Sequence, residues 1–161
     1  MRTATVALTL LSLAPSPLFA GQDTGAATTQ AEPKQPADAP SYVRRFEDAD
    51  FRDLNPAMSP GAQAAVLWGD PKTGPSAVLF KMRRGATPLH THTSTYHLVV
   101  VQGVMKHWVK GESEREAPSL NPGSYWFIEG GRPHADACLS EECIAFIRWD
   151  GRRDGHLAES Q

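Results

Sequence analysis

Short apolar runs alternate with Gly, Pro and Asp turn signals at close spacing from residue 42 onward. In one of these runs, Val78, Phe80 and Met82 share one side of an extended chain, and Lys81 lies on the other. A period of two residues is typical of a strand with one buried face. We identify no helix, and the runs predict strands over residues 64–68, 77–82, 97–102, 105–109, 124–128, 133–137 and 144–149.

The run that begins at Met105 has the same alternation. Lys106 and Lys110 favour solvent, so Met105, His107 and Val109 are predicted to face the interior. Many short strands joined by turns are typical of an all-β sandwich or barrel. We therefore predict an all-β fold, and the 161 residues leave room for one domain.

Residues 1–20 have the layout of a secretory signal peptide. Arg2 gives a basic start, residues 4–14 are almost entirely apolar, and a Pro-containing break precedes the cut predicted after Ala20. The apolar stretch is too short to span a bilayer. Residues 21–41 hold no large apolar side chain, which predicts a disordered, flexible tether. The expected location is therefore periplasmic or secreted.

The domain itself is predicted over residues 42–155, with a polar C-terminal tail at residues 156–161. The chain carries 16 Lys and Arg against 18 Asp and Glu, a formal net charge of −2. It has no basic patch with interleaved aromatic residues, so nucleic acid is not an expected partner. No later segment is apolar over the length that a membrane span needs.

The two cysteines, Cys138 and Cys143, enclose the polar sequence Leu-Ser-Glu-Glu, which has the length of a hairpin loop. They could face each other at the neck of that hairpin, and an oxidising compartment would favour a disulfide between them. So small a loop predicts only about 2 kcal/mol of stabilisation. The alternative is one or two free thiols, with Cys138 near a metal.

Four of the six histidines lie in two clusters. His90 and His92 are two residues apart, so on a strand their imidazoles point to one side. A short turn would bring His97 back on the next strand, and three neutral nitrogens could then bind one ion. His134 follows an Arg-Pro turn. The alternatives are hydrogen-bonded residues at a barrel mouth for the first pair and a turn residue for His134.

Two longer segments carry a family resemblance. Residues 85–103, GATPLHTHTSTYHLVVVQG, resemble the first cupin motif, and residues 123–138, GSYWFIEGGRPHADAC, resemble the second. The runs WGDPKTGPSAVLFK, GVMKHW, NPGSYWFIEGGRPH and CLSEEC are similar to a bacterial cupin family catalogued as a domain of unknown function. The resemblance covers about residues 64–149 and implies a single jelly-roll-type β-barrel.

The resemblance implies that His90, His92, His97 and His134 hold one divalent transition metal inside this barrel. His97 stands where most cupins have a glutamate, and the alternative is a pocket histidine that hydrogen-bonds to substrate. Four neutral ligands would leave the charge of the ion uncompensated and make it a stronger Lewis acid. Imidazole ligands suit Fe, Mn, Ni, Cu or Zn, and the sequence does not choose among them.

Several other side chains could take part in the chemistry. Burial near a cation would keep His107 neutral, which suits a general base, and the alternative is a hydrogen-bonded core histidine. Asp136 could orient a ligand histidine. Tyr96, Tyr125 and Trp126 either line a pocket or pack in the core.

Two functions fit these expectations. The first is an exported metalloenzyme of dioxygenase, isomerase or lyase type that acts on a small molecule, because open positions on the ion could accept substrate. The second is a non-catalytic cupin in which the metal is structural or helps to capture a small ligand, favoured by the scarcity of acid and base residues. A homodimer is an expectation from the family alone.

Overall fold

The computed structural model describes residues 41–55 and 61–158, so the predicted signal peptide and nearly all of the predicted tether lie outside the described residues. In the described part, the chain forms a short 3-10 turn, η1 (Phe46–Asp48), and one nine-stranded sheet, which confirms the all-β prediction. The strands are β1 (Arg52–Asp53), β2 (Gln63–Gly69), β3 (Ser76–Ala86), β4 (His90–Thr91), β5 (Tyr96–Gln102), β6 (Met105–Val109), β7 (Tyr125–Ile128), β8 (His134–Trp149) and β9 (His156–Leu157).

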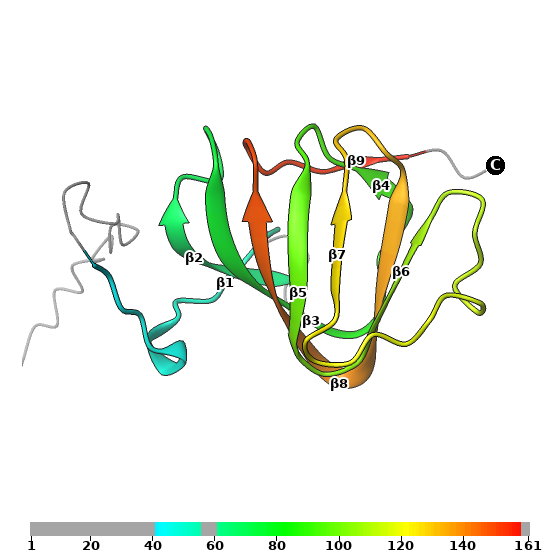
Figure 1. Ribbon diagram of the computed structural model, residues 1–161, viewed down its shortest axis with the longest axis horizontal. Coiled ribbons are helices and arrows are strands. Elements are labelled where there is room, and N and C mark those ends of the chain that lie inside the picture. Colours follow the sequence, from blue (N-terminus) through cyan, green and yellow to red (C-terminus); the bar gives the residue numbers. More distant parts are fainter. Residues whose placement is uncertain (1–40, 56–60, 159–161) are drawn as a thin grey trace, which may run out of the picture. The chain divides into compact units, whose positions relative to one another are not determined.

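The long strand β8 has neighbours on both of its edges. On one edge it runs antiparallel to β3, from the pair Ser76 with Trp149 to the pair Ala86 with Ala137. On the other edge, β6 pairs with its first half and β5 with its second half. β8 bends between these halves, at the lower edge of Figure 1. The bend lets one strand serve two sides of a curled, barrel-like sheet, and its first residue brings a histidine into the interior.

The bend in β8 replaces a predicted hairpin. Residues 133–137 and 144–149 were expected as separate strands, yet both segments pair antiparallel to β3, so the chain does not reverse direction between them. The register jumps from Arg83 with Glu142 to Gly85 with Cys138, which marks a bulge in β8. A disulfide joins Cys138 to Cys143 across this bulge, with their Cα atoms 5.8 Å apart. The predicted disulfide is present, and the predicted hairpin loop is wrong.

The two faces of β3 pack against different groups of side chains. Val78 and Met82 belong to the inner core, as the alternation predicts, and Leu79 belongs to a smaller cluster on the other face. The buried inner core consists of Val78, Met82, Tyr96, Leu98, Val100, Met105, Trp126, Ile128, Cys138, Cys143, Ala145, Ile147 and Trp149. Some of these side chains, among them Leu98, Met105 and Ile147, also line a cavity inside the curled sheet.

The three two-residue strands, β1, β4 and β9, were not predicted because two residues carry no alternation. β9 pairs with β4 through Leu157 with His90 and His156 with Thr91. The fold therefore continues past residue 155, where the polar tail was expected to begin. Within the described residues, no helix combines the length and apolar character needed to cross a membrane.

Candidate metal centre

Three histidines meet on the inner side of the sheet. β4 pairs with the first residue of β8, which sets His90 opposite His134, and His92 follows two residues after His90. One ring nitrogen of each histidine lies within 4.8 Å of those of the other two. His134 is fully buried, whereas His90 and His92 are half-buried. The structure thus brings together three of the four histidines predicted as ligands.

A backbone carbonyl orients each of these rings. Nδ1 of His90 and Nδ1 of His134 each lie 2.9 Å from the carbonyl oxygen of the residue two positions earlier in the chain. Nδ1 of His92 bonds to the carbonyl oxygen of Asp154. Because a carbonyl oxygen only accepts, Nδ1 carries a proton in each of the three rings, and the neutral form of each ring therefore has its lone pair on Nε2. This is how the ring of a metal-binding histidine is normally fixed.

Burial keeps two imidazoles of the cluster, those of His92 and His134, neutral. Burial is the main cause that lowers the pKa of His92 from 6.5 to about 4; the neighbouring rings of His90 and His134 contribute to this shift, and the hydrogen bond to the Asp154 carbonyl opposes it. Burial is also the main cause that lowers the pKa of His134. Near pH 7 these two histidines therefore hold no second proton, and their Nε2 lone pairs are available to a metal.

The segment between β8 and β9 fastens the loop that follows β4. The Asp154 carboxylate accepts hydrogen bonds from the backbone N–H of Thr93 at 2.8 Å and from its hydroxyl at 2.6 Å. Burial acts to raise the pKa of Asp154, but hydrogen bonds from Thr93 and His156 outweigh it and lower the value to about 2. The ring of Trp149 packs against that of His92, with centroids 4.8 Å apart. His92 is thus held by a carbonyl and by an aromatic ring.

His97, the fourth predicted ligand, does not belong to this group. Its neighbours Tyr96, Leu98 and Val100 on β5 are at most 3% exposed, so the alternation of the strand turns His97 to the outer face. There Nδ1 of His97 lies 2.8 Å from the hydroxyl of Tyr125. The predicted four-histidine site is corrected to three histidines, because neighbouring residues on one strand cannot both face the interior.

Tyr96 takes the inward position next to the cluster. Its hydroxyl lies 3.2 Å from Nε2 of His134 and accepts a hydrogen bond of 3.4 Å from the indole N–H of Trp126. Since Nδ1 of His134 carries the proton, the Tyr96 hydroxyl donates to Nε2. Burial raises the pKa of Tyr96, so the phenol keeps its proton. Tyr96 was expected only to line a pocket or pack, and it places a polar oxygen at the site.

His107 lies inside the barrel, as the alternation of β6 predicts, but its partner is a carboxylate. Nδ1 of His107 lies 2.8 Å from Oδ1 of Asp136, and both side chains are 13% exposed. Asp136 therefore orients His107, not one of the three clustered histidines as predicted. Among the described residues, the wall of the interior cavity includes Asp136 and leaves out His107. A general-base role for His107 stays a prediction.

The cluster borders an interior cavity of about 410 Å³. This volume suits a small organic molecule. His90, His92 and Tyr96 lie on its wall, together with Arg153 from the segment between β8 and β9. Most of the remaining wall is apolar, formed by Leu54, Ala62, Ala64, Val78, Phe80, Leu98, Met105, Ile147, Trp149 and Leu157.

The donor set of the cluster fits a divalent transition metal. Metal-bound imidazole nitrogens lie about 2.0–2.1 Å from an ion, so two of them are at most about 4.2 Å apart. The outer limit of 4.8 Å between the ring nitrogens is only slightly wider. Neutral nitrogen donors suit Zn, Fe, Ni, Cu or Mn, whereas Mg and Ca prefer oxygen. Three protein ligands leave at least one position on such an ion for another molecule.

The curled sheet has the fold of the cupins, which it shares with an RmlC-like cupin and a double-stranded β-helix protein of known structure. Within this class the chain belongs to the family described as "Domain of unknown function (DUF4437)", which matches residues 43–154. No curated protein matches the chain in sequence.

Solved structures with the same fold come from several kinds of protein. The DMSP lyase DddQ from Ruegeria pomeroyi DSS-3 is 20% identical with a TM-score of 0.56, over 70% of this chain and 62% of DddQ. The polyketide cyclase RemF from Streptomyces resistomycificus is 19% identical with a TM-score of 0.58, over 74% of this chain and 89% of RemF. An RmlC-like cupin from Shewanella frigidimarina NCIMB 400 is 17% identical with a TM-score of 0.55, over 71% of this chain and 94% of that cupin.

These likenesses establish the fold and leave the activity open, because one fold serves many reactions. The chain spans less than two thirds of the length of DddQ, which has further residues of its own. The function of this chain has to be argued from its own site.

Proposed function

We propose that this protein is an exported, metal-dependent cupin that acts on a small organic molecule in its interior cavity. The metal ligands are His90, His92 and His134. One observation carries the proposal: all three rings donate Nδ1–H to a backbone carbonyl, which leaves three Nε2 lone pairs in one cluster. Histidines that only pack in a core have no reason to share this orientation.

A divalent metal bound there would supply a Lewis acid that polarises an oxygen of the bound molecule. The side chains of the protein position that molecule. The apolar wall of the 410 Å³ cavity excludes water from most of its surface. The Tyr96 hydroxyl lies 3.2 Å from Nε2 of His134. Once a metal took the lone pair of that nitrogen, the Tyr96 O–H would be free to donate to a molecule bound at the same end of the cavity.

Lyase or isomerase chemistry is the reaction type that we place first, ahead of dioxygenase chemistry. Such reactions need a polarised substrate and a positioned proton donor, and the cavity wall offers Tyr96 for the second role. Two proteins of the same fold carry the names lyase and cyclase, which supports this choice by analogy only.

A non-catalytic small-ligand-binding cupin is the second candidate. Apart from the two half-buried ligand histidines, the described groups on the cavity wall that can exchange a proton are few. Asp136 is bonded to His107, and His156 lies 3.5 Å from the Asp154 carboxylate. This shortage of free acids and bases favours capture of a ligand without turnover.

Export is part of the proposal because two features of the chain agree on it. Residues 1–20 have the order of a signal peptide, and the Cys138–Cys143 disulfide suits an oxidising compartment. N-terminal sequencing of the protein purified from a periplasmic fraction tests this point. A mature chain that starts at Gly21 supports export, and an intact Met1 contradicts it.

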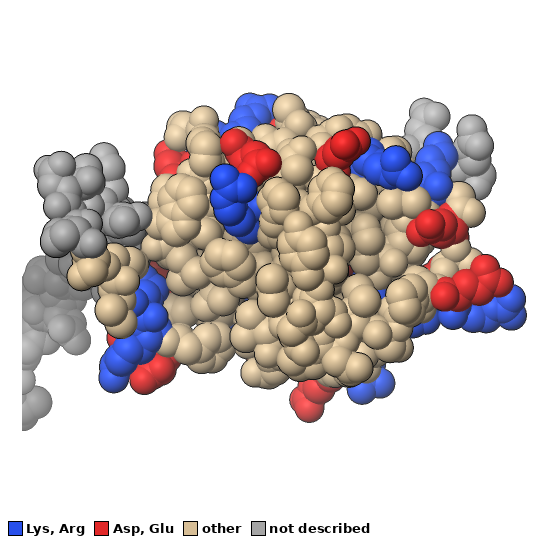
Figure 2. Space-filling model, in the orientation of Figure 1, with Lys and Arg blue, Asp and Glu red and all other residues tan. Residues whose placement is uncertain are grey.

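A second copy of the chain is the partner expected for the outer face of β5 and β7. Phe127, Tyr125 and Val101 there are 53%, 55% and 45% exposed. Uncharged side chains dominate the middle of this face in Figure 2, and charged ones gather near its edges. Light scattering on the native protein and on Phe127→Ser tests the interface. A native dimer that the substitution converts to a monomer supports it, and a native monomer contradicts it.

The central test is the metal content of natively exported protein, measured by mass spectrometry beside the double variant His90→Ala, His134→Ala. About one Fe, Mn, Ni, Cu or Zn per chain, lost in the variant, is the expected result. His97→Ala is the matched control and should keep its metal, because His97 lies on the outer face. Negligible metal in both the native protein and the double variant contradicts the proposal.

A further inference from the structure

Arg153 carries a buried charge that the rest of the described chain does not neutralise. It lies between β8 and β9 and is half-buried, and its guanidinium forms no hydrogen bond or ion pair with any described residue. Burial lowers the pKa of Arg153, and the nearby Asp154 carboxylate partly offsets this effect. Asp154 itself is bonded to Thr93. A buried cation is usually paired with an anion or held by hydrogen bonds, and the Arg153 guanidinium has neither among the described residues.

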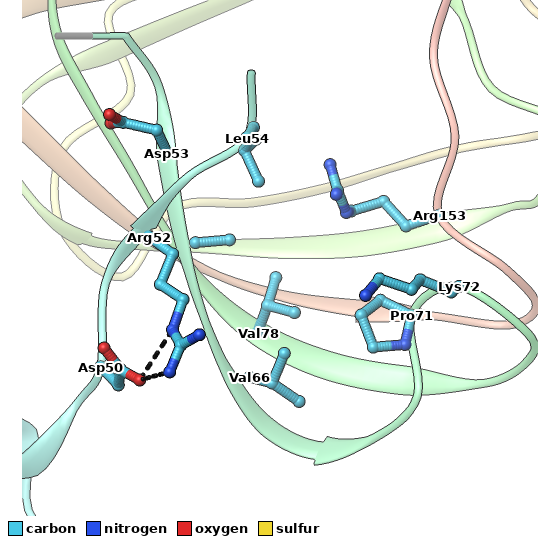
Figure 3. Close-up of a pocket in the computed structure, with 10 residues that line it drawn as sticks. Asp50, Arg52, Asp53, Leu54, Val66, Pro71, Lys72, Val78 and Arg153 are labelled. Carbon is cyan, nitrogen blue, oxygen red and sulfur yellow. Dashed lines mark hydrogen bonds and ion pairs between the residues drawn. The ribbon is translucent and has the colours of Figure 1, made fainter. Parts of the chain in front are cut away.

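The guanidinium borders two adjoining cavities. One is the interior cavity of about 410 Å³ that reaches His90 and His92, and the other is a smaller cavity of about 230 Å³. Figure 3 shows the smaller one, with the Arg153 side chain directed into it toward Leu54. The residues that line both cavities are Leu54, Ala64, Val78 and Arg153. A molecule in the larger cavity can therefore reach Arg153 from the histidine side.

The acidic side chains on these two walls already have partners. The contacts are Arg52 with Asp50 at 2.6 Å, Gln63 with Asp53 at 3.0 Å, and His107 with Asp136 at 2.8 Å. The remaining cation is Lys72, which is exposed and whose amino end points into the smaller cavity in Figure 3. Two cations that have no carboxylate partner among the described residues therefore face this space, which favours an anion as its occupant.

We infer that Arg153 binds the carboxylate of a small organic acid whose other end lies beside His90, His92 and Tyr96. The planar guanidinium matches the two oxygens of a carboxylate, and a single half-buried cation balances a single negative charge. The apolar wall accommodates a carbon skeleton between the two ends. The inference deepens the proposed function and rests on it for the reacting end of the molecule.

The backbone fixes the distance between the two ends. The N–H of Arg153 donates to the carbonyl oxygen of Pro71 at 2.7 Å, which ties this segment to the loop between β2 and β3. The next residue, Asp154, uses its carbonyl to orient the ring of His92. The carboxylate-binding residue and the partner of a metal-binding histidine are therefore consecutive in one anchored segment. Such preorganisation lowers the entropy lost when a ligand binds.

The test measures binding of matched probes by calorimetry, with metal-free and with zinc-loaded protein. The probe pairs are benzoate with benzamide, phenylacetate with phenylacetamide, and butyrate with butyramide, and inorganic phosphate is a separate probe. The variants are Arg153→Gln, Arg153→Lys and Arg84→Gln. Arg84 is exposed on β3, so its variant makes the same charge change away from the cavities. Metal content is measured on every sample.

At least one acid should bind more tightly than its amide. Arg153→Gln should weaken that acid by at least about tenfold, the size expected for a charge-assisted hydrogen bond. Arg153→Lys should restore part of the affinity, and Arg84→Gln should change nothing. The inference is overturned if the acid and its amide bind equally, if Arg153→Gln has no effect, if phosphate binds more tightly than every acid, or if no acid binds at millimolar concentration.

The failure of the inference can be told apart from that of the proposed function. If the native protein holds no metal but Arg153 still governs binding of the acid, the metal site fails and the carboxylate site stands. If one metal per chain is present and the acids show no dependence on Arg153, the metal site stands and the carboxylate site fails.

Discussion

Two tyrosine–histidine pairs lie on opposite faces of the same sheet. Inside the barrel, the hydroxyl of Tyr96 lies 3.2 Å from Nε2 of His134. On the outer face, the hydroxyl of Tyr125 lies 2.8 Å from Nδ1 of His97. The chemical groups are the same, yet only the inner histidine has two further imidazoles beside it. The comparison separates what makes a histidine a metal ligand from the mere presence of a histidine in a motif.

The difference lies in what holds the second ring nitrogen. Nδ1 of His134 is held by a backbone carbonyl, so the nitrogen that faces the cluster has a lone pair. In His97, Nε2 lies 3.7 Å from the Asp150 carboxylate, and the side chain is 37% exposed. The carbonyl partner and the inward face together define the ligand set.

Metal affinity should show the largest difference between the inner and the outer histidines. His92→Gln should weaken metal binding at least about 100-fold. Loss of a residue that only orients a ligand costs up to about this factor, and His92→Gln removes a ligand itself. His97→Gln should leave the affinity unchanged. Competition with a coloured chelator measures both variants. An equal loss in the two variants would mean that His97 reaches the metal and that the comparison is wrong.

The sequence does not show which of the two series of side chains on β5 faces the interior. Tyr96, Leu98 and Val100 form one apolar series, and His97 lies in the other, whose members Val99 and Val101 are just as apolar. Apolarity alone therefore leaves the register of this strand undecided. The structure decides it, because the inner series packs against the core and Val101 stays 45% exposed. The motif resemblance placed His97 inside the barrel, because most cupins have a metal ligand at this position. That placement was wrong.

Other parts of the site were predictable to different degrees. The spacing of His90 and His92 and the position of His134 in the second motif predicted three histidines that do meet. The continuous strand β8 was hidden because the polar residues 139–142 resemble a hairpin loop, although they form a bulge. Arg153 gave no signal at all, since only the packing of residues 41–55 and 61–158 reveals its unneutralised charge.

The pH dependence of the free energy of unfolding should also distinguish the inner His92 from the outer His97. In the unfolded chain His92 takes up a proton below its ordinary pKa of 6.5, and in the folded protein only near 4. As the pH falls through this window the unfolded state gains a proton that the folded state refuses, so the metal-free protein loses stability. The loss from His92 is about 2–3 kcal/mol, and above pH 6.5 it contributes none.

Urea unfolding of metal-free protein at pH 7 and pH 4.5 measures this loss. His92→Gln should reduce the difference between the two pH values, because glutamine does not titrate. His97→Gln is the outer-face control and should keep the difference. A difference that is the same in the native protein and in His92→Gln would show that the inner histidine is not held neutral by burial.

Removal of the disulfide tests whether the metal site depends on the bend of β8. The double substitution Cys138→Ala, Cys143→Ala should lower the free energy of unfolding by about 2 kcal/mol, because the closed loop is short. Metal content should stay at one per chain, since the carbonyl that orients His134 lies upstream of the bend. Urea unfolding and mass spectrometry measure the two quantities. Loss of metal along with stability would mean that the bend itself positions His134.

The smallest expected effect comes from removing one hydroxyl from each pair. Tyr96→Phe should lower the free energy of unfolding by about 1–2 kcal/mol, because it leaves the buried indole N–H of Trp126 without an acceptor. Tyr125→Phe should cost less than about 0.5 kcal/mol, since Tyr125 is 55% exposed and water can replace its hydroxyl. Urea unfolding of both variants measures the contrast. Equal losses would mean that the inner pair is no better shielded from water than the outer one, and the cavity would then be wetter than its apolar wall implies.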